Sequence, residues 1–309
     1  MAASSSLPLL RWRLAQLAAH LVVALIALVV VGGATRVMEA GLACPDWPLC
    51  FGSFLPGRQM NLQVFLEWFH RLDAFLIGIV LVGQFFFSLF LRSKLPKWLP
   101  WVYFLLVLMV ASQGALGALT VLQLLPSTVV TAHLVLALFL VMAMSGLSQV
   151  LFSTSSLSSP LWWRIGGSVS LFSLFTQCLL GGRMASSWAA QRCIAVGDSC
   201  VWLELHRNYA VSVTIFMFCF IFSSILVKGW TRSQWPFLAC LTILLLFQLG
   251  LGIFTLDLGL TQPLLTVLHQ LVASLLVALM SALLFRRPKE PSTYLSNLVD
   301  SKPLEPCHG

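Results

Sequence analysis

Four histidines are the first side chains in this sequence whose type and spacing could do chemistry. His70, His133, His206 and His269 each lie near one end of a long apolar run, in a chain of which only 9% of the residues are charged. An ionisable group at membrane depth is costly and usually faces the interior of a helix bundle, with a partner. Two neutral imidazoles on facing helices are suited to axial ligation of haem iron. One such histidine alone is more often a packing residue, but four at repeated positions favour haem binding.

Zinc or copper is the main alternative ligand for these histidines. A structural zinc site needs four protein ligands, and each pair of histidines here is accompanied by at most one carboxylate. The many Phe, Leu and Gly residues around the histidines fit a macrocycle better than a bare ion. His20 lies near the other end of its apolar run, a leaflet away, and is interpreted as a packing or interfacial residue.

An acid accompanies the first histidine in the stretch "LEWFHRLDAF". Glu67 precedes His70 by three residues, and on a helix this spacing puts both on one face. The second copy has Glu204 two residues before His206, a spacing that does not share a face. We therefore expect Glu67 to be catalytic, taking a proton or stabilising developing positive charge. The alternative role for Glu67 is that of a helix-start residue favoured by the helix dipole.

Arginines directly follow two of the histidines. Arg71 comes after His70, and Arg207 comes after His206. The planar guanidinium matches a carboxylate, so a haem propionate is the ligand we expect for both. Simple anchoring at the membrane–water interface is the alternative.

The elements that must position these residues are membrane helices. Of the 309 residues 59% are hydrophobic, and mean hydropathy is +0.94, more apolar surface than a soluble domain could hide. Eight windows of about 20 residues are long enough to cross a bilayer. They lie near residues 12–32, 70–91, 99–120, 129–150, 164–182, 206–227, 236–255 and 264–285. The sequence predicts an all-α polytopic membrane protein whose first span is not a removable signal peptide.

The basic residues predict the orientation of the chain in the membrane. Most of the 18 Lys and Arg fall on the side that holds both termini, and positive loops stay inside, so both termini are expected in the cytoplasm. The long loops near 33–69 and 183–205, with the histidine ends of the helices, then lie outside. No basic patch with interleaved aromatics forms a separate domain, so nucleic-acid binding is not expected. A bacterial cytoplasmic membrane is expected, because no Arg- and Ser-rich presequence precedes the first span.

The two halves of the chain repeat each other. The separation along the chain between His70 and His206 equals that between His133 and His269. Between them "QGALGALT" matches "QLGLGIFT", and "GGATR" resembles "GGRM". Both halves have an even number of spans and start on the same side, so we expect parallel four-helix repeats related by an axis along the membrane normal.

The repeat divides the chain into three parts. The boundary between the halves falls in the Ser-rich stretch "FSTSSLSSP". We expect residues 1–156 to form the N-terminal four-helix half and residues 157–287 the C-terminal half. Residues 288–309 are polar and contain proline, and we expect them to be a flexible cytoplasmic tail.

Each long outer loop contains two closely spaced cysteines. Cys44 and Cys50 lie in "CPDWPLC", and Cys193 and Cys200 lie in "CIAVGDSC". Disulfides persist outside the cytoplasm, and the prolines and the glycine in these loops allow tight turns. We expect one disulfide in each loop; a redox-active or metal-binding pair is the alternative.

The stretches "GLACPDWPLCFG" and "EWFHR", the later histidines and the eight-span repeat resemble the haem A synthase family, from about Arg11 to Arg287. The resemblance implies oxidation of the C8 methyl group of haem O to a formyl group, which makes haem A for terminal oxidases. It also implies partners, namely a haem O synthase and an electron acceptor.

The resemblance also assigns roles to the histidines and the acid. It implies that His70 and His133 flank the substrate haem O, that His206 and His269 ligate haem b, and that Glu67 is the essential acid. The paired loop cysteines match the disulfide positions of the family.

Two other functions compete with this one. A b-type cytochrome that moves electrons across the bilayer would have histidines at both leaflets, whereas all four lie at one depth here. A non-enzymatic haem carrier would explain the four histidines but not Glu67.

Overall fold

The computed structural model describes residues 6–153, 155, 157–187 and 201–288 of the chain. In these residues the regular structure is helical, apart from an isolated bridge between Cys50 and Ser53. The long helices are α1 (Ser6–Val37), α2 (Leu62–Phe90), α3 (Leu99–Leu122), α4 (Ser127–Phe152), α5 (Leu161–Ser186), α7 (Val201–Leu226), α9 (Trp235–Asp257) and α10 (Pro263–Phe285). Short helices η1 (Gly57–Gln59) and α8 (Trp230–Ser233) lie in the connections. The predicted all-α class is confirmed.

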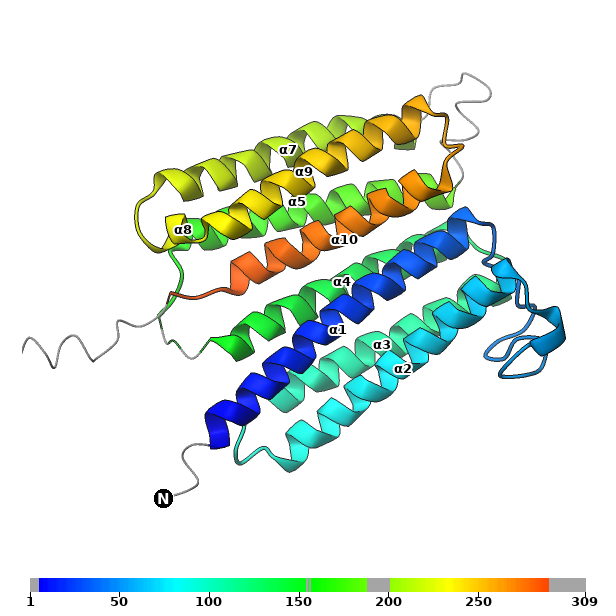
Figure 1. Ribbon diagram of the computed structural model, residues 1–309, viewed down its shortest axis with the longest axis horizontal. Coiled ribbons are helices and arrows are strands. Elements are labelled where there is room, and N and C mark those ends of the chain that lie inside the picture. Colours follow the sequence, from blue (N-terminus) through cyan, green and yellow to red (C-terminus); the bar gives the residue numbers. More distant parts are fainter. Residues whose placement is uncertain (1–5, 154, 156, 188–200, 289–309) are drawn as a thin grey trace, which may run out of the picture.

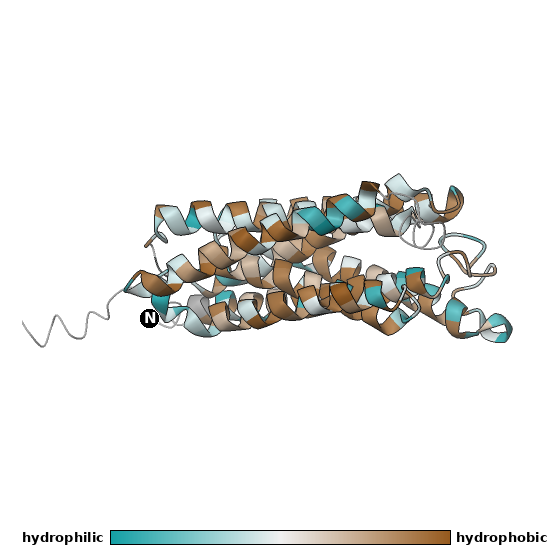
Figure 2. Ribbon diagram, turned by 90° about the horizontal axis from the view of Figure 1, so that it is seen from above, coloured by the Kyte–Doolittle hydropathy of each residue, from teal (hydrophilic) through white to brown (hydrophobic). Residues whose placement is uncertain are grey.

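Among the described residues, eight helices are long and apolar enough to cross a membrane. They correspond one to one to the eight predicted windows, so the prediction of eight spans is confirmed. Hydrophobic residues predominate along the middle of the helices (Figure 2). The chain is a multi-pass membrane protein.

The helices extend beyond the apolar windows that predicted them. α1 continues to Val37, and α2 begins at Leu62, eight residues before its predicted window. The side chain of Asn61 caps α2 by accepting a hydrogen bond from the Val64 N–H at 2.9 Å. Hydropathy reports the thickness of the hydrocarbon, whereas helical hydrogen bonding continues past it. Glu67 and His70 therefore lie well inside α2 rather than at its start.

The helices form two groups that follow the order of the sequence (Figure 1). The first group is α1 to α4, and the second is α5, α7, α9 and α10. Contacts between the groups come from α1, α4, α5 and α10, with α4 packed against α10 at the centre. The start of α1 and the end of α10 lie at one end of the molecule, and the loop between α1 and α2 lies at the other (Figure 1).

A reciprocal pair of hydrogen bonds joins α4 and α10. Ser145 Oγ donates to the carbonyl of Ala278, and Ser281 Oγ donates to the carbonyl of Met142, both at 2.7 Å. Ser281 follows Ser145, and Ala278 follows Met142, by the same offset that relates the histidines of the two halves. This reciprocity supports the prediction of two related repeats. The axis along the membrane normal and the cytoplasmic side of the termini stay predictions.

Glycines let the two groups approach each other closely. A Cβ on Gly33 of α1 would lie 2.2 Å from Oε1 of Gln270 in α10, and a Cβ on Gly182 of α5 would lie 3.0 Å from Leu134 in α4. Gly33 and Gly182 follow the paired Gly32 and Gly181 of the repeat. Packing at these two points excludes any larger residue without a shift of the neighbour.

Candidate functional site

The four predicted histidines form two pairs of matching geometry. His70 of α2 faces His133 of α4, with ring centroids 6.4 Å apart and ring planes at 68°. His206 of α7 faces His269 of α10, also at 6.4 Å, with ring planes at 71°. The structure therefore brings together the pairs that the repeat predicted.

A glycine on the neighbouring helix lies against the first histidine of each pair. A Cβ on Gly32 would lie 2.9 Å from Cε1 of His70, and a Cβ on Gly181 would lie 2.8 Å from Cε1 of His206. Real Cβ atoms do not approach this closely, so only glycine leaves these rings where they are. These glycines aligned the two halves in the sequence, but their role beside the imidazoles could be seen only in the structure.

The second histidine of each pair also has a glycine beside it. A Cβ on Gly117 of α3 would lie 3.6 Å from Cε1 of His133, and a Cβ on Gly252 of α9 would lie 3.2 Å from Cε1 of His269. All four rings are thus held at the surface of a neighbouring helix backbone, with no side chain between.

Glutamines contact three of the histidines. Gln177 Nε2 donates to the backbone carbonyl of His206 at 2.9 Å and lies 3.4 Å from its ring Nε2. Gln248 Nε2 lies 3.2 Å from Nε2 of His269. Gln113 Nε2 donates to the carbonyl of His133 at 3.0 Å. Gln113 and Gln248 begin the matching stretches "QGALGALT" and "QLGLGIFT", and this match could have indicated from the sequence that both contact a histidine.

The arrangement of the rings fits axial ligation of haem iron. In the part of the chain that the structure describes, Nδ1 of all four histidines is buried without a hydrogen-bond partner. Two metal–nitrogen bonds of about 2 Å each account for most of the 6.4 Å between facing rings. No group of three or more His, Cys, Asp or Glu side chains lies together among the described residues, as a structural zinc site would need.

The carboxylate of Glu67 is buried and held on both oxygens. Its side chain is 4% exposed, Oε2 accepts from the Cys44 N–H at 2.8 Å, and Oε1 accepts from Nη2 of Arg71 at 2.5 Å. The i,i+3 spacing to His70 predicted a shared face, but it could not show that a loop occupies the carboxylate. Glu204 lies in the first turn of helix α7, before the predicted span, and is exposed.

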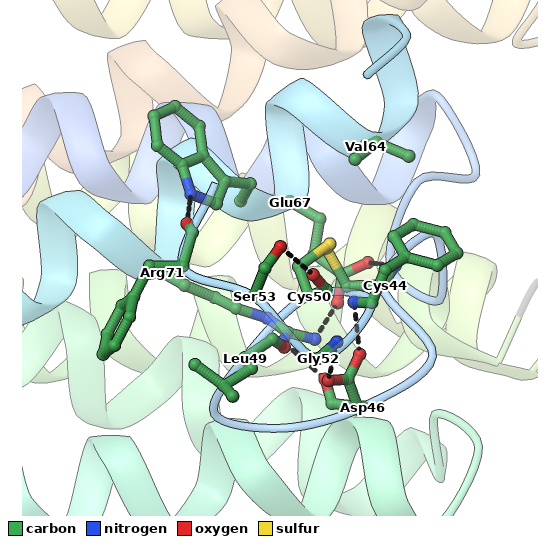
Figure 3. The surroundings of a disulfide bond; sticks show 12 residues. Cys44, Asp46, Leu49, Cys50, Gly52, Ser53, Val64, Glu67 and Arg71 are labelled. Atoms are coloured by element: carbon green, nitrogen blue, oxygen red, sulfur yellow. Dashed lines mark hydrogen bonds and ion pairs between the residues drawn. A yellow bond between two sulfur atoms is a disulfide. The ribbon is translucent and has the colours of Figure 1, made fainter. Parts of the chain in front are cut away.

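Arg71 fastens the loop between α1 and α2 to α2 (Figure 3). Its Nη1 donates to the carbonyls of Asp46 and Leu49, both at 2.6 Å, while Nη2 reaches Glu67. The sequence predicted a haem propionate as the ligand of Arg71. In the structure its guanidinium donates to two loop carbonyls and to Glu67. Arg207, its counterpart, is exposed.

The loop also has bonds of its own. The predicted disulfide between Cys44 and Cys50 is present, with both residues buried beside Val64 (Figure 3). The Asp46 carboxylate accepts from the N–H groups of Phe51 and Gly52, at 2.6 and 2.8 Å. These backbone hydrogen bonds lower the pKa of Asp46 below its usual value, and the bond from Gly52 has the largest effect.

Two predictions concern residues that the structure does not describe. The predicted pairing of Cys193 with Cys200 lies outside the described residues and stays a prediction. The same is true of the tail after Pro288, which was predicted to be flexible.

Comparison with known proteins assigns the chain to a family. The model of the family described as cytochrome oxidase assembly protein matches residues 15–281. The "Heme A synthase" of Shewanella oneidensis is 32% identical over 192 residues, which are 54% of this chain and 56% of that protein. Those of Sphingopyxis alaskensis and Flavobacterium johnsoniae are each 26% identical, over 85% and 86% of this chain and 89% and 95% of their own lengths. Since the family model matches most of the length of this chain, the chain belongs to the family of cytochrome oxidase assembly proteins.

Proposed function

We propose that this protein is a haem A synthase, an oxidoreductase that converts the C8 methyl group of haem O to a formyl group. One observation carries the proposal: two histidine pairs share one geometry, but only the first has a buried acid on the preceding turn of its helix. A protein that only stores or transfers two haems has no need of that difference. The names of the relatives, "Heme A synthase", agree with the proposal.

The first half, residues 1–156, would hold the substrate. His70 and His133 would flank haem O, in the cradle formed by Gly32 and Gly117. The neighbouring carboxylate of Glu67 and the disulfide loop support this assignment, because both lie at the end of α2 that carries His70.

The second half, residues 157–287, would hold haem b through His206 and His269. Gln177 supports this assignment because it holds the backbone of His206 through the carbonyl. Gln248, with its amide turned so that Oε1 accepts from Nε2–H of His269, would fix that ring with Nδ1 free for iron. Leu28 stands in α1 where the repeat has Gln177 in α5, so the first half lacks that amide. When bound, haem b would supply one-electron redox chemistry. We also propose two partners, an electron acceptor and a haem O synthase.

Oxidation of a methyl to a formyl group would take two successive two-electron steps. Each step would replace a C–H bond by a C–OH bond to the oxygen of a water molecule, release two protons and pass two electrons to the proposed acceptor. The first step gives the hydroxymethyl group and the second a hydrate, which loses water to leave the formyl group. Positive charge that develops on the methyl carbon needs a fixed negative group nearby. Glu67 can supply it without moving, because Arg71 and the Cys44 N–H hold its carboxylate in place. Each carboxylate oxygen accepts one of these bonds and keeps a second lone pair that could take a proton. We favour the electrostatic role because both oxygens are held in place.

The arginines and the membrane side complete the proposal. Arg207 is exposed and can bind a propionate of haem b. Three of the five N–H groups of Arg71 hold the loop and Glu67, and Nε–H and the second N–H of Nη2 would be the donors to a propionate of haem O. The histidine pairs and the disulfide loop would lie on the outer side of the cytoplasmic membrane.

Extraction of the pigments from the purified protein, followed by chromatography, tests this function. Haem b together with haem O, hydroxylated haem O or haem A is the expected result. Haem b alone would support the b-type cytochrome instead, and unmodified haem O in cells that also express a haem O synthase would support a carrier.

A further inference from the structure

A second site lies far from the histidines, between α1 and α2. A cavity of about 390 Å³ opens there, in the range of small-ligand pockets. Its walls include Arg13, Leu14 and Leu17 from α1, and Gly83, Gln84 and Phe87 from α2. Gln84 follows His70 by fourteen residues on one helix, which at about 1.5 Å per residue is about 21 Å. The cavity is therefore separate from the haem site and near the opposite face of the membrane.

Gln84 lines this cavity with an unsatisfied amide. Its side chain is 4% exposed, and both Oε1 and Nε2 are buried without a hydrogen-bond partner among the described residues. A buried amide without partners costs free energy, and inside a membrane water cannot relieve it. A group that both donates and accepts a hydrogen bond would satisfy it.

The second half fills the equivalent space with aromatic rings. Phe220 follows Gln84 by the offset that relates the histidines, and Trp163 follows Leu14 by the offset that relates Gly181 to Gly32. Trp163 and Phe220 are buried, with ring centroids 4.8 Å apart. The four-helix arrangement can thus be packed tightly at this point. The cavity in the first half results from its own residues and is not imposed by the fold.

The walls indicate the chemistry of the occupant. Leu17 and Phe87 are 40% and 42% exposed on the outer surface of the helices, so the cavity opens toward lipid. Arg13, which is exposed, adds a positive charge to the cavity wall. An apolar tail can therefore leave through the open side while a polar head meets the amide and the guanidinium.

We propose that the cavity between α1 and α2 binds the head of a lipid-tailed ligand that exchanges hydrogen bonds with Gln84 and directs an oxygen toward Arg13. Two membrane components share this chemistry. A quinol offers hydroxyl groups on a ring, and phosphatidylglycerol offers glycerol hydroxyls beside a phosphate. The proposal concerns a site apart from the haems and does not depend on their identity.

Direct binding to the purified, haem-loaded protein tests the proposal. The probes are a short-tailed benzoquinol and a short-chain phosphatidylglycerol, each titrated in detergent and followed by calorimetry. Gln84→Leu removes the amide, and Gly83→Phe fills the cavity at a position where a Cβ meets no other atom within 4 Å among the described residues. Cys219→Phe is the matched control, because Cys219 is exposed on α7 at the position that corresponds to Gly83 in the repeat.

The proposal expects one probe to bind saturably to the unaltered protein and to Cys219→Phe. Both cavity variants should bind it at least about tenfold more weakly, with unchanged haem absorption as the check on folding. The probe that behaves in this way identifies the source of the head group. Absence of saturable binding by both probes, or equal binding to Gln84→Leu and Gly83→Phe and to the unaltered protein, would overturn the proposal.

Discussion

Glu67 and Arg71 form an ion pair across one turn of α2, with 2.5 Å between Oε1 and Nη2. Each partner also binds the backbone of the disulfide loop, Glu67 through the Cys44 N–H and Arg71 through two carbonyls. Because Glu67 and Arg71 lie on either side of His70 in α2, the helical turn that contains His70 is fastened to the disulfide loop. This links the candidate acid, the candidate iron ligand and the disulfide in one rigid unit.

Replacing Arg71 by Gln should loosen the loop. The substitution leaves Glu67 and the carbonyls of Asp46 and Leu49 without their donor, and bonds to charged groups contribute about 1.5–3 kcal/mol each. We expect faster proteolysis within residues 38–61 and faster reduction of the Cys44–Cys50 disulfide. The control is Arg207→Gln at the exposed counterpart, which should change neither rate.

Substituting the glycines beside the histidines should remove haem from one half at a time. Gly181→Ala places a methyl group against His206 and should lower haem b content, while Gly32→Ala should lower only the haem of the first half. Mutation of a residue that orients a metal ligand typically lowers the affinity for the metal by about 10- to 100-fold. Pigment analysis of each variant measures both haems.

Gly114 and Gly250 provide the matched controls for these substitutions. They lie in α3 and α9, and a Cβ at either meets no atom within 4 Å among the described residues. Alanine there should leave both haems in place. Equal haem loss from Gly114→Ala and Gly32→Ala would contradict the proposed cradle.

The stability of the loop should depend on pH through Asp46. Its pKa is lowered in the folded loop, chiefly by the Gly52 N–H, so the stabilisation is complete above the ordinary value of 3.8 and is lost as pH falls through the folded value. Amide hydrogen exchange at Phe51 and Gly52, corrected for the intrinsic rate, should therefore rise only below about pH 4. In Asp46→Asn this dependence on pH should disappear; its persistence would assign it to another group.

The reciprocal bonds between α4 and α10 should be energetically equivalent. Ser145→Ala and Ser281→Ala each remove one hydroxyl bond to a carbonyl, and each should lower stability by about 0.5–1.5 kcal/mol. Thermal unfolding in one detergent compares the two variants. Markedly unequal losses would argue against the two-fold relation of the halves.

Much of the fold followed from the sequence because it depends on composition and repetition. Apolar length predicted the eight helices, and the common offset between the halves predicted which histidines face each other. The close spacing of Cys44 and Cys50 predicted their disulfide. Each of these features is recorded along the chain, so it can be read without knowing the packing.

Other features depend on packing and could not be read in this way. Hydropathy did not show that α2 starts at Leu62, because helical hydrogen bonding does not stop at the edge of the hydrocarbon. Spacing placed Glu67 near His70 but could not show that the loop folds back onto its carboxylate. The cavity at Gln84 depends on what neighbouring side chains leave unfilled, which the chain order does not record.

The central claim is that Glu67 turns a haem-binding half into a haem-modifying one, and the haems of Glu67→Gln test it most directly. The glutamine side chain would be isosteric and could still accept from the Cys44 N–H, but it would lack the negative charge. The account predicts that the purified variant retains haem b in full and contains haem O without haem A, whereas Glu204→Gln makes haem A normally. Normal haem A in Glu67→Gln would contradict the account.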